Sequence, residues 1–118
     1  MRKKYSNIGQ WQAVSFKQDD QFILRVKALL PTQNPGANCF LRKMASASQP
    51  EVGLVLRLDG SEHINVESAE LTYICYKEVS NEPFAFRNVI VVSFINGSKS
   101  SSFIAATDIL ERGNGCGI

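Results

Sequence analysis

Apolar and polar residues alternate with a period of two along much of the chain. The clearest case covers residues 22–30, where one side is wholly apolar: Phe22, Leu24, Val26, Ala28 and Leu30. Arg25 and Lys27 stand on the other side. This period is that of a strand with one buried face. Residues 11–16 form a second such segment, and the polar residues 17–21 between the two favour a turn, so we predict a first hairpin.

Five further segments are predicted to be strands: residues 39–45, 52–58, 71–79, 84–95 and 99–105. Residues 39–45 also fit one or two helical turns, but we favour the strand. The segment 31–38 holds two prolines, a glycine and two asparagines, which is typical of a long loop. The β-branched run Val89–Val92 indicates a central strand covered on both faces, and Asn96–Gly97 indicates a tight hairpin after it.

The alternation of side chains between the two faces decides the length of the loop at Asp59–Gly60. A two-residue loop would place Leu56 opposite His63 and so mix apolar and polar residues on one face. A three-residue loop places Leu54 opposite Ile64 instead. We therefore predict a bulged hairpin after Leu58 in which Gly60 has a positive φ.

About seven short strands with frequent turn signals predict an all-β fold: a single-domain antiparallel β-sandwich or a small β-barrel. Residues 1–118 form one domain in this prediction, with flexible ends at about 1–9 and 113–118. Thr107–Arg112 favours one short closing helical turn, because an acidic residue stands near its start and a basic one at its end. The expected core consists of Trp11, Leu24, Val26, Leu54, Leu56, Ile74, Ile90, Val92 and Phe94.

The length of 118 residues limits the chain to one core. Val89–Val92, an apolar run as long as any in the chain, is far below the roughly 20 residues of a membrane span. The basic start, Met1–Tyr5, is followed by polar residues rather than by the apolar segment of a signal peptide, which favours a cytoplasmic protein, or a secreted one that has lost its leader.

Three widely spaced cysteines favour reduced thiols, with a Cys39–Cys75 disulfide as the alternative.

The net charge is only +2, but the charges are unevenly placed. Residues 1–50 hold eight lysines and arginines against two aspartates, a net of +6, whereas residues 51–118 hold five bases against nine acids, a net of −4. If the halves pair across one sheet, these charges meet as cross-strand pairs. If they form separate faces, the basic half suits nucleic acid or an acidic partner.

Catalytic motifs are missing from the sequence. His63 is the only histidine, which excludes mechanisms that need two imidazoles and histidine-rich metal sites. The cysteine spacing fits no metal clip, and no glycine-rich loop precedes a helix in the way a phosphate site requires. We therefore expect no catalytic residues, no metal and no cofactor. A thiol enzyme that uses Cys75 and His63 is the least favoured hypothesis.

A binding module without enzymatic activity is the function that we favour. Its partner would be another protein or a second copy of the chain, held through a sheet edge or an apolar patch. The strand beginning Lys99–Ser102 is the candidate edge, because it lacks proline and has one charge. Phe84, Phe86 and Arg87 are the candidate contact residues, since aromatic rings beside an arginine are typical of interfaces. In the other reading, Phe84 and Phe86 close one end of the core.

An oligonucleotide-binding β-barrel is the alternative function. Small barrels hold single strands on basic surfaces that carry aromatic rings. Three segments combine rings with positive charge, and one of them is residues 84–87. The other two give the candidate residues Arg2, Lys3, Lys4, Tyr5, Phe40, Arg42 and Lys43.

Overall fold

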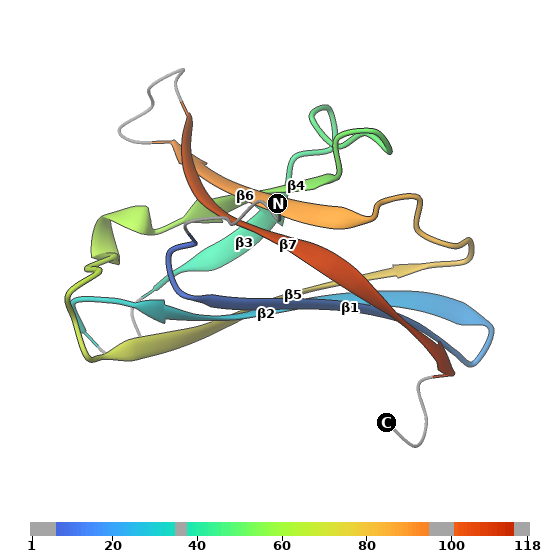
Figure 1. Cartoon of the computed structure of the whole chain (residues 1–118), viewed down its shortest axis with the longest axis horizontal. Coiled ribbons are helices and arrows are strands. Elements are labelled where there is room, and N and C mark those ends of the chain that lie inside the picture. Colours follow the sequence, from blue (N-terminus) through green and yellow to red (C-terminus); the bar gives the residue numbers. More distant parts are fainter. Residues whose placement is uncertain (1–6, 35–37, 95–100, 115–118) are drawn as a thin grey trace, which may run out of the picture.

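The computed structural model describes residues 7–34, 38–94 and 101–114, which form seven strands and one short 3₁₀ helix (Figure 1). The elements are β1 (Gln10–Gln18), β2 (Gln21–Pro31), β3 (Phe40–Lys43), β4 (Leu54–Asp59), η1 (Ser61–His63), β5 (Leu71–Ser80), β6 (Asn88–Phe94) and β7 (Ser101–Asn114). The prediction of an all-β domain of about seven strands is confirmed.

All seven strands belong to one sheet in the order β3-β4-β6-β7-β1-β2-β5. The sheet curls until its edge strands, β3 and β5, approach each other, so of the two predicted architectures the structure is a nearly closed barrel (Figure 1). The expectation of a purely antiparallel sheet is wrong, because β1 pairs with β7 and β4 pairs with β6 in parallel. Such pairs join segments that are distant in sequence, which local turn signals do not reveal.

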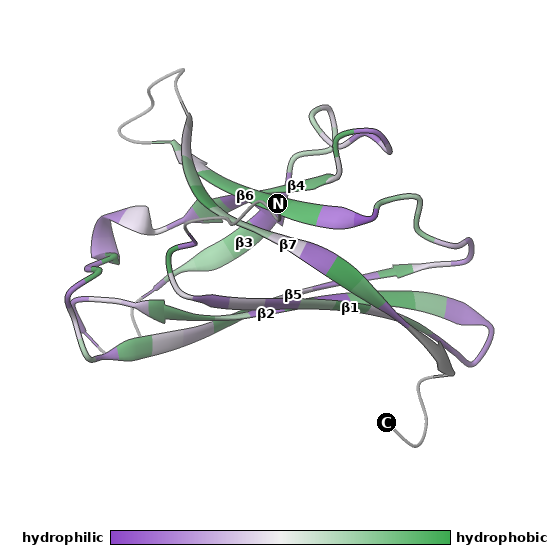
Figure 2. Cartoon of the chain, in the orientation of Figure 1, coloured by the Kyte–Doolittle hydropathy of each residue, from purple (hydrophilic) through white to green (hydrophobic). Residues whose placement is uncertain are grey.

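The core fills the barrel interior. On β2 the alternation predicted from the sequence is confirmed, since Leu24, Val26, Ala28 and Leu30 are all buried. The β1–β2 hairpin is also confirmed, with Asp19 and Asp20 at positive φ in its two-residue turn. Hydrophobic stretches recur along the strands, whereas η1 and the β1–β2 turn are hydrophilic (Figure 2).

The predicted inner face of β6 is wrong. Val89, Val91 and Ser93 are buried, whereas Ile90, Val92 and Phe94 are only half-buried, so the strand is not fully covered on both faces. The pairing with β4 explains which side of β6 is buried, because the buried Leu54 and Leu56 lie beside Val89 and Val91. Both sides of β6 are rich in apolar residues, so hydrophobicity alone does not select one. Trp11, also expected in the core, is half-buried and packs against it.

The predicted hairpin after Leu58 is also wrong. β4 is followed by η1, and its neighbours in the sheet are β3 and β6. Ile64 forms an isolated bridge with Thr32 instead of pairing with Leu54. The positive φ expected for Gly60 is present, at 88°.

The C-terminal part differs from the prediction in two ways. Thr107–Arg112 is not helical but belongs to β7, where it gains backbone partners from β1. β7 lies between β6 and β1, so the segment beginning at Ser101 is not a sheet edge. β6 starts at Asn88, later than predicted, and the expected turn at Asn96–Gly97 lies outside the described residues.

The segments at the two ends of the described chain are attached to the barrel. The amide of Ile8 donates to the carbonyl of Ile104 at 2.9 Å, and the Asn7 side chain exchanges two hydrogen bonds with the backbone of Ala106. Residues 113 and 114 continue β7. The remaining residues of the expected flexible ends, 1–6 and 115–118, lie outside the described ranges.

Candidate functional site

The opening between β3 and β5 is closed by side chains. Lys43 Nζ lies 3.1 Å from Glu78 Oε2, and the Tyr76 hydroxyl donates to Glu78 Oε1 at 2.6 Å. Lys43 Nζ also stands 5.7 Å from the centroid of the Phe86 ring. Lys43 and Phe86, which the sequence assigned to two different candidate sites, therefore meet at this seam. In the structure both side chains help to close the barrel wall between β3 and β5.

The seam makes stability sensitive to alkaline pH. The pKa of Tyr76 lies well above its ordinary value of 10.0, first because burial disfavours the phenolate and then because its hydroxyl donates to Glu78. A raised pKa in the folded state contributes stability below pH 10, and this contribution is lost as pH rises from there towards the folded pKa. We expect the melting temperature of the wild type to fall more steeply above about pH 10 than that of Tyr76→Phe.

Thermal unfolding followed by circular dichroism from neutral to alkaline pH measures this difference. Tyr73→Phe is the matched control, because the Tyr73 ring is exposed on the same strand and should leave the wild-type profile unchanged. Parallel pH profiles for the wild type and Tyr76→Phe would contradict the assignment of the shift to Tyr76.

A compact group of rings and guanidinium groups covers the outer face of the barrel beside this seam. We call it the aromatic–arginine patch and define it by Phe40, Arg42, Arg57, Phe94 and Phe103. Phe40 and Arg42 flank Leu41, whose partner Leu58 is buried, so both point away from the core. Cross-strand pairing continues the row from Arg42 through Arg57 and Val92 to Phe103. Phe40 and Phe103 are 48% and 46% exposed.

Asp59 holds the two arginines of the patch in place. Arg42 Nη2 donates to Asp59 Oδ2 at 2.7 Å, and Arg57 Nε donates to Oδ1 at 3.1 Å. Each guanidinium also lies near a ring: Arg42 is 6.0 Å from the centroid of Phe40, and Arg57 is 5.1 Å from that of Phe94. Two arginines share one carboxylate, so the patch keeps a net positive charge.

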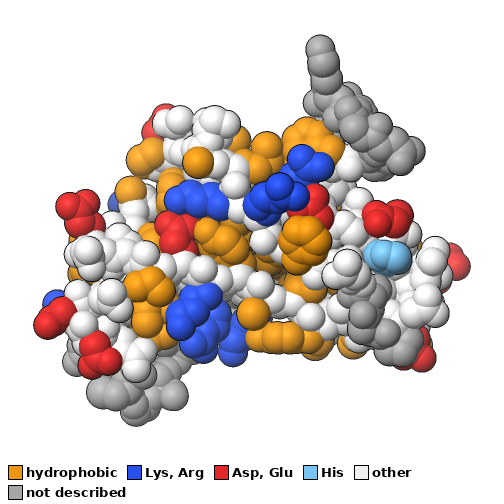
Figure 3. All heavy atoms as spheres, turned by 180° about the vertical axis from the view of Figure 1, so that it is seen from behind, with side chains coloured by type: hydrophobic (Ala, Val, Ile, Leu, Met, Phe, Trp, Pro, Cys, Tyr) orange, Lys and Arg blue, Asp and Glu red, His pale blue; other side chains and the backbone are white. Residues whose placement is uncertain are grey.

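Positive charge extends beyond the patch across neighbouring strands. Strands β2 to β5 carry six lysines and arginines but only two acidic residues, Asp59 and Glu78. From behind, basic side chains gather in the middle of the barrel among hydrophobic ones, and most acidic side chains lie towards the two ends (Figure 3). The charge imbalance of the sequence is thus only partly resolved by cross-strand pairs such as Arg42–Asp59 and Lys43–Glu78.

Three basic residues of β2 and β5 form a second feature, which we call the basic triad: Arg25, Lys27 and Lys77. Arg25 lies directly opposite Lys77, and Lys27 lies opposite Cys75 on the same outer face. None of the three has a salt bridge among the described residues. Sequence alternation indicated the outward direction of Arg25 and Lys27, but the pairing of β2 with β5 was needed to add Lys77.

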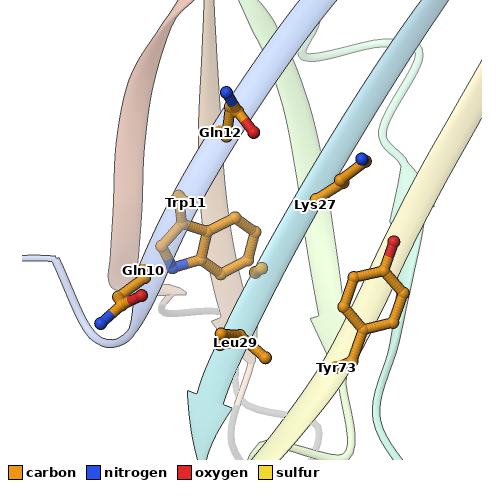
Figure 4. A pocket seen from close by; sticks show the side chains of 7 residues that line it. Gln10, Trp11, Gln12, Lys27, Leu29 and Tyr73 are labelled. Carbon is orange, nitrogen blue, oxygen red and sulfur yellow. The ribbon is translucent and has the colours of Figure 1, made fainter.

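A shallow cleft of about 470 Å³ adjoins the triad. Gln10 and Gln12 of β1 lie on one side, Tyr73 of β5 on the other, and Leu29 and Lys27 of β2 between them (Figure 4). Trp11 also lines the cleft and is anchored by its indole Nε1, which donates to the carbonyl of Ile8 at 2.7 Å.

The remaining residues proposed from the sequence do not form one surface. Phe84 and Phe86 are half-buried and pack against the core. Arg87 is exposed, and its backbone carbonyl accepts a hydrogen bond from Ile109 at 2.9 Å. The contact role of these three residues stays a prediction. Of the nucleic-acid candidates, Phe40 and Arg42 share the patch, Lys43 lies in the seam, and residues 2–5 lie outside the described ranges.

Two of the three thiols and the histidine lie in the described part of the chain. Cys39 and Cys75 are both free, so the alternative of a disulfide between them is not found. Burial, and secondly the Glu62 carboxylate, raise the pKa of the Cys39 thiol above 9.0, which makes it a poorer nucleophile. His63 Nε2 lies 3.7 Å from Glu62 Oε1. Within the described ranges, no three His, Cys, Asp or Glu side chains gather to hold a metal ion.

Comparison with protein-family models, with curated proteins and with solved structures finds no match to this chain. In the described part of the chain, no helix is long and apolar enough to cross a membrane. The candidate site is therefore interpreted from its own geometry.

Proposed function

We propose that the protein is a binding module that holds single-stranded nucleic acid on the outer face of its barrel. The observation that carries this proposal is the aromatic–arginine patch, in which exposed rings and guanidinium groups share one surface across four strands. Proteins that bind single strands combine these two elements, because rings stack on bases and cations attract phosphates. The proposal needs no catalysis, metal or cofactor, and a cytoplasmic location would give the barrel access to nucleic acid.

Each member of the patch has a distinct task in this proposal. The half-exposed rings of Phe40 and Phe103 offer stacking surfaces, and every base has a face that can stack on them. Arg42 and Arg57 supply fork-shaped donors that suit phosphate oxygens. Asp59 holds both guanidinium groups in position before the ligand arrives, which lowers the conformational entropy that binding must remove.

Fluorescence anisotropy with a labelled twelve-nucleotide single strand tests the proposal. We expect binding that weakens steeply with increasing salt, because bound counterions are released from the phosphates. Phe40→Ala should weaken binding about tenfold through lost stacking, and Arg42→Ala should both weaken it and reduce the salt dependence.

Val66→Ala is the control, since Val66 is the most exposed of the large hydrophobic residues and lies in the loop between η1 and β5. It should bind as the wild type does. Circular dichroism of each variant verifies that the fold is retained. Absence of salt-sensitive binding by the wild type, or equal affinities for Phe40→Ala and Val66→Ala, would refute the proposal.

A protein partner is the second candidate, favoured by the outer side of β5. Leu71, Tyr73 and Val79 are all about half exposed there. The backbone amide of Thr32 donates to the carbonyl of Glu70, and from there every second residue of β5 forms backbone hydrogen bonds with β2. The residues between them have outward side chains, and their backbone N–H and C=O groups point away from β2. These groups are available to an added strand wherever β3 leaves the edge uncovered.

Sedimentation velocity over a range of concentrations tests whether the protein partner is a second copy of the chain. We expect association that Leu71→Ser combined with Val79→Ser abolishes. A strict monomer at high concentration would exclude pairing between copies.

A further inference from the structure

The outer faces of β1, β2 and β5 form a regular grid of side chains. Cross-strand pairing places Gln10, Leu29 and Tyr73 in one row, then Gln12, Lys27 and Cys75 in the next. The third row contains Arg25 and Lys77. Neighbouring rows on one face of a sheet are about 7 Å apart. The cleft and the basic triad are therefore parts of one continuous surface.

Like charges meet in the basic triad, although the Arg25 guanidinium also lies 5.7 Å from the centroid of the Phe16 ring. Arg25 and Lys77 are directly opposed like charges, an arrangement that destabilises a strand pair. Lys27 adds a third positive charge on the same face, and no acidic side chain of the described residues forms an ion pair with any of them. A bound anion would relieve this repulsion.

The cleft next to the triad suits a flat, partly apolar group with polar edges. Tyr73 is 57% exposed and offers a ring, while Leu29 supplies an apolar floor beside it. Gln12 stands opposite with an amide that can both donate and accept hydrogen bonds, whereas the amide of Gln10 points away from Tyr73 and Leu29 (Figure 4). A nucleotide combines such a flat base with an anionic phosphate.

We propose that this cleft is a second nucleotide subsite, in which a base stacks on Tyr73 and its phosphates lie over Arg25, Lys27 and Lys77. The amide of Gln12 faces the edge of the base and gives the subsite a preference among bases. This inference rests on the proposed function and extends it from the patch to the other side of the β3–β5 seam. A strand bound at both places follows the basic side chains around the barrel.

Lys77→Glu separates this proposal from a purely structural role of the triad, because it acts in opposite directions on stability and binding. The new carboxylate would face Arg25 as a cross-strand ion pair, so the melting temperature of the free protein should rise by about 2 to 4 °C. The same change should weaken binding of the twelve-nucleotide strand at least tenfold, since it introduces a negative charge where phosphate lies.

Arg87→Glu is the matched control, because it alters the net charge equally at an exposed position outside both surfaces. The contact role predicted for Arg87 concerns a protein partner and not nucleic acid. It should weaken binding much less than Lys77→Glu does. Tyr73→Ala should reduce affinity about tenfold through lost stacking. Gln12→Ala should narrow the difference in affinity among adenine, cytosine and thymine homopolymers.

The outcomes distinguish the two proposals. If the wild type binds no oligonucleotide, the proposed function fails and the subsite fails with it. If the wild type binds and Phe40→Ala weakens it, but Lys77→Glu matches Arg87→Glu and Tyr73→Ala matches the wild type, the subsite alone is overturned. Equal affinity for all three homopolymers would overturn the base preference assigned to Gln12.

Discussion

Leu56→Ala is expected to lower the free energy of unfolding by about 3 to 5 kcal/mol. Leu56 is fully buried on β4, at the centre of the half of the barrel formed by β3, β4 and β6. Removal of its side chain leaves a cavity in the core beneath β4. Because β4 is held by strands on both sides, it cannot move inward to fill this cavity. This loss is a large fraction of the stability of an ordinary domain. Chemical denaturation at neutral pH measures it.

The same substitution at Leu110 is the matched control. Leu110 is 52% exposed on β7, so Leu110→Ala should change the free energy of unfolding by less than about 1 kcal/mol. A second pair tests the inner face of β6: Val91→Ala should cost clearly more than Val92→Ala, because Val91 is 1% exposed and Val92 is half-buried. A larger loss of stability for Val92→Ala than for Val91→Ala would instead support the inner face of β6 that the sequence predicted.

Gly60→Ala is expected to destabilise the protein by about 2 to 4 kcal/mol. Gly60 has a φ of 88°, a conformation that is strained for residues with a Cβ. An added Cβ would also meet the backbone carbonyl oxygen of Asn38 and approach Cα of Cys39 to 3.0 Å. Both neighbours precede β3, so relief of this contact would displace that strand. Thermal and chemical unfolding measure the loss.

Gly60→Asn separates the two causes of the destabilisation. Asparagine tolerates positive φ better than alanine does, but it carries the same Cβ. An intermediate loss is expected if strain and crowding both contribute, and a loss equal to that of Gly60→Ala if the contact with Asn38 dominates. A fully stable Gly60→Ala protein would contradict the close approach of these two segments.

Local chemistry determined much of the strand structure. On β2 one side of the alternation is wholly apolar and the other carries Arg25 and Lys27, so only one orientation buries no charge. Gly60 was expected at positive φ in a bulged hairpin; that hairpin is absent, but the positive φ is present where Gly60 precedes η1. Each of these predictions depends on a few residues that are close in sequence.

Long-range pairing decided the points on which sequence reasoning failed. Thr107–Arg112 satisfies the charge preferences of a helix, yet in the barrel it gains the backbone hydrogen bonds of β1, about a hundred residues earlier in the chain. β6 has two apolar sides, and only its pairing with β4 directs Val89 and Val91 inward. No local signal predicts either partner.

The candidate site, too, was indicated only in part by the sequence. The sequence brought together Phe40 and Arg42, because residues two apart on a strand share a face. Arg57, Phe94 and Phe103 join them only through the strand order β3-β4-β6-β7, and Lys77 joins Arg25 only through the pairing of β5 with β2. The period of the sequence therefore determined which side chains of a strand share a face, and on β2, where only one face is apolar, which face is buried. The tertiary structure decided the buried face of β6 and which strands are neighbours, because partners are chosen by burial of the whole sheet rather than by local preference.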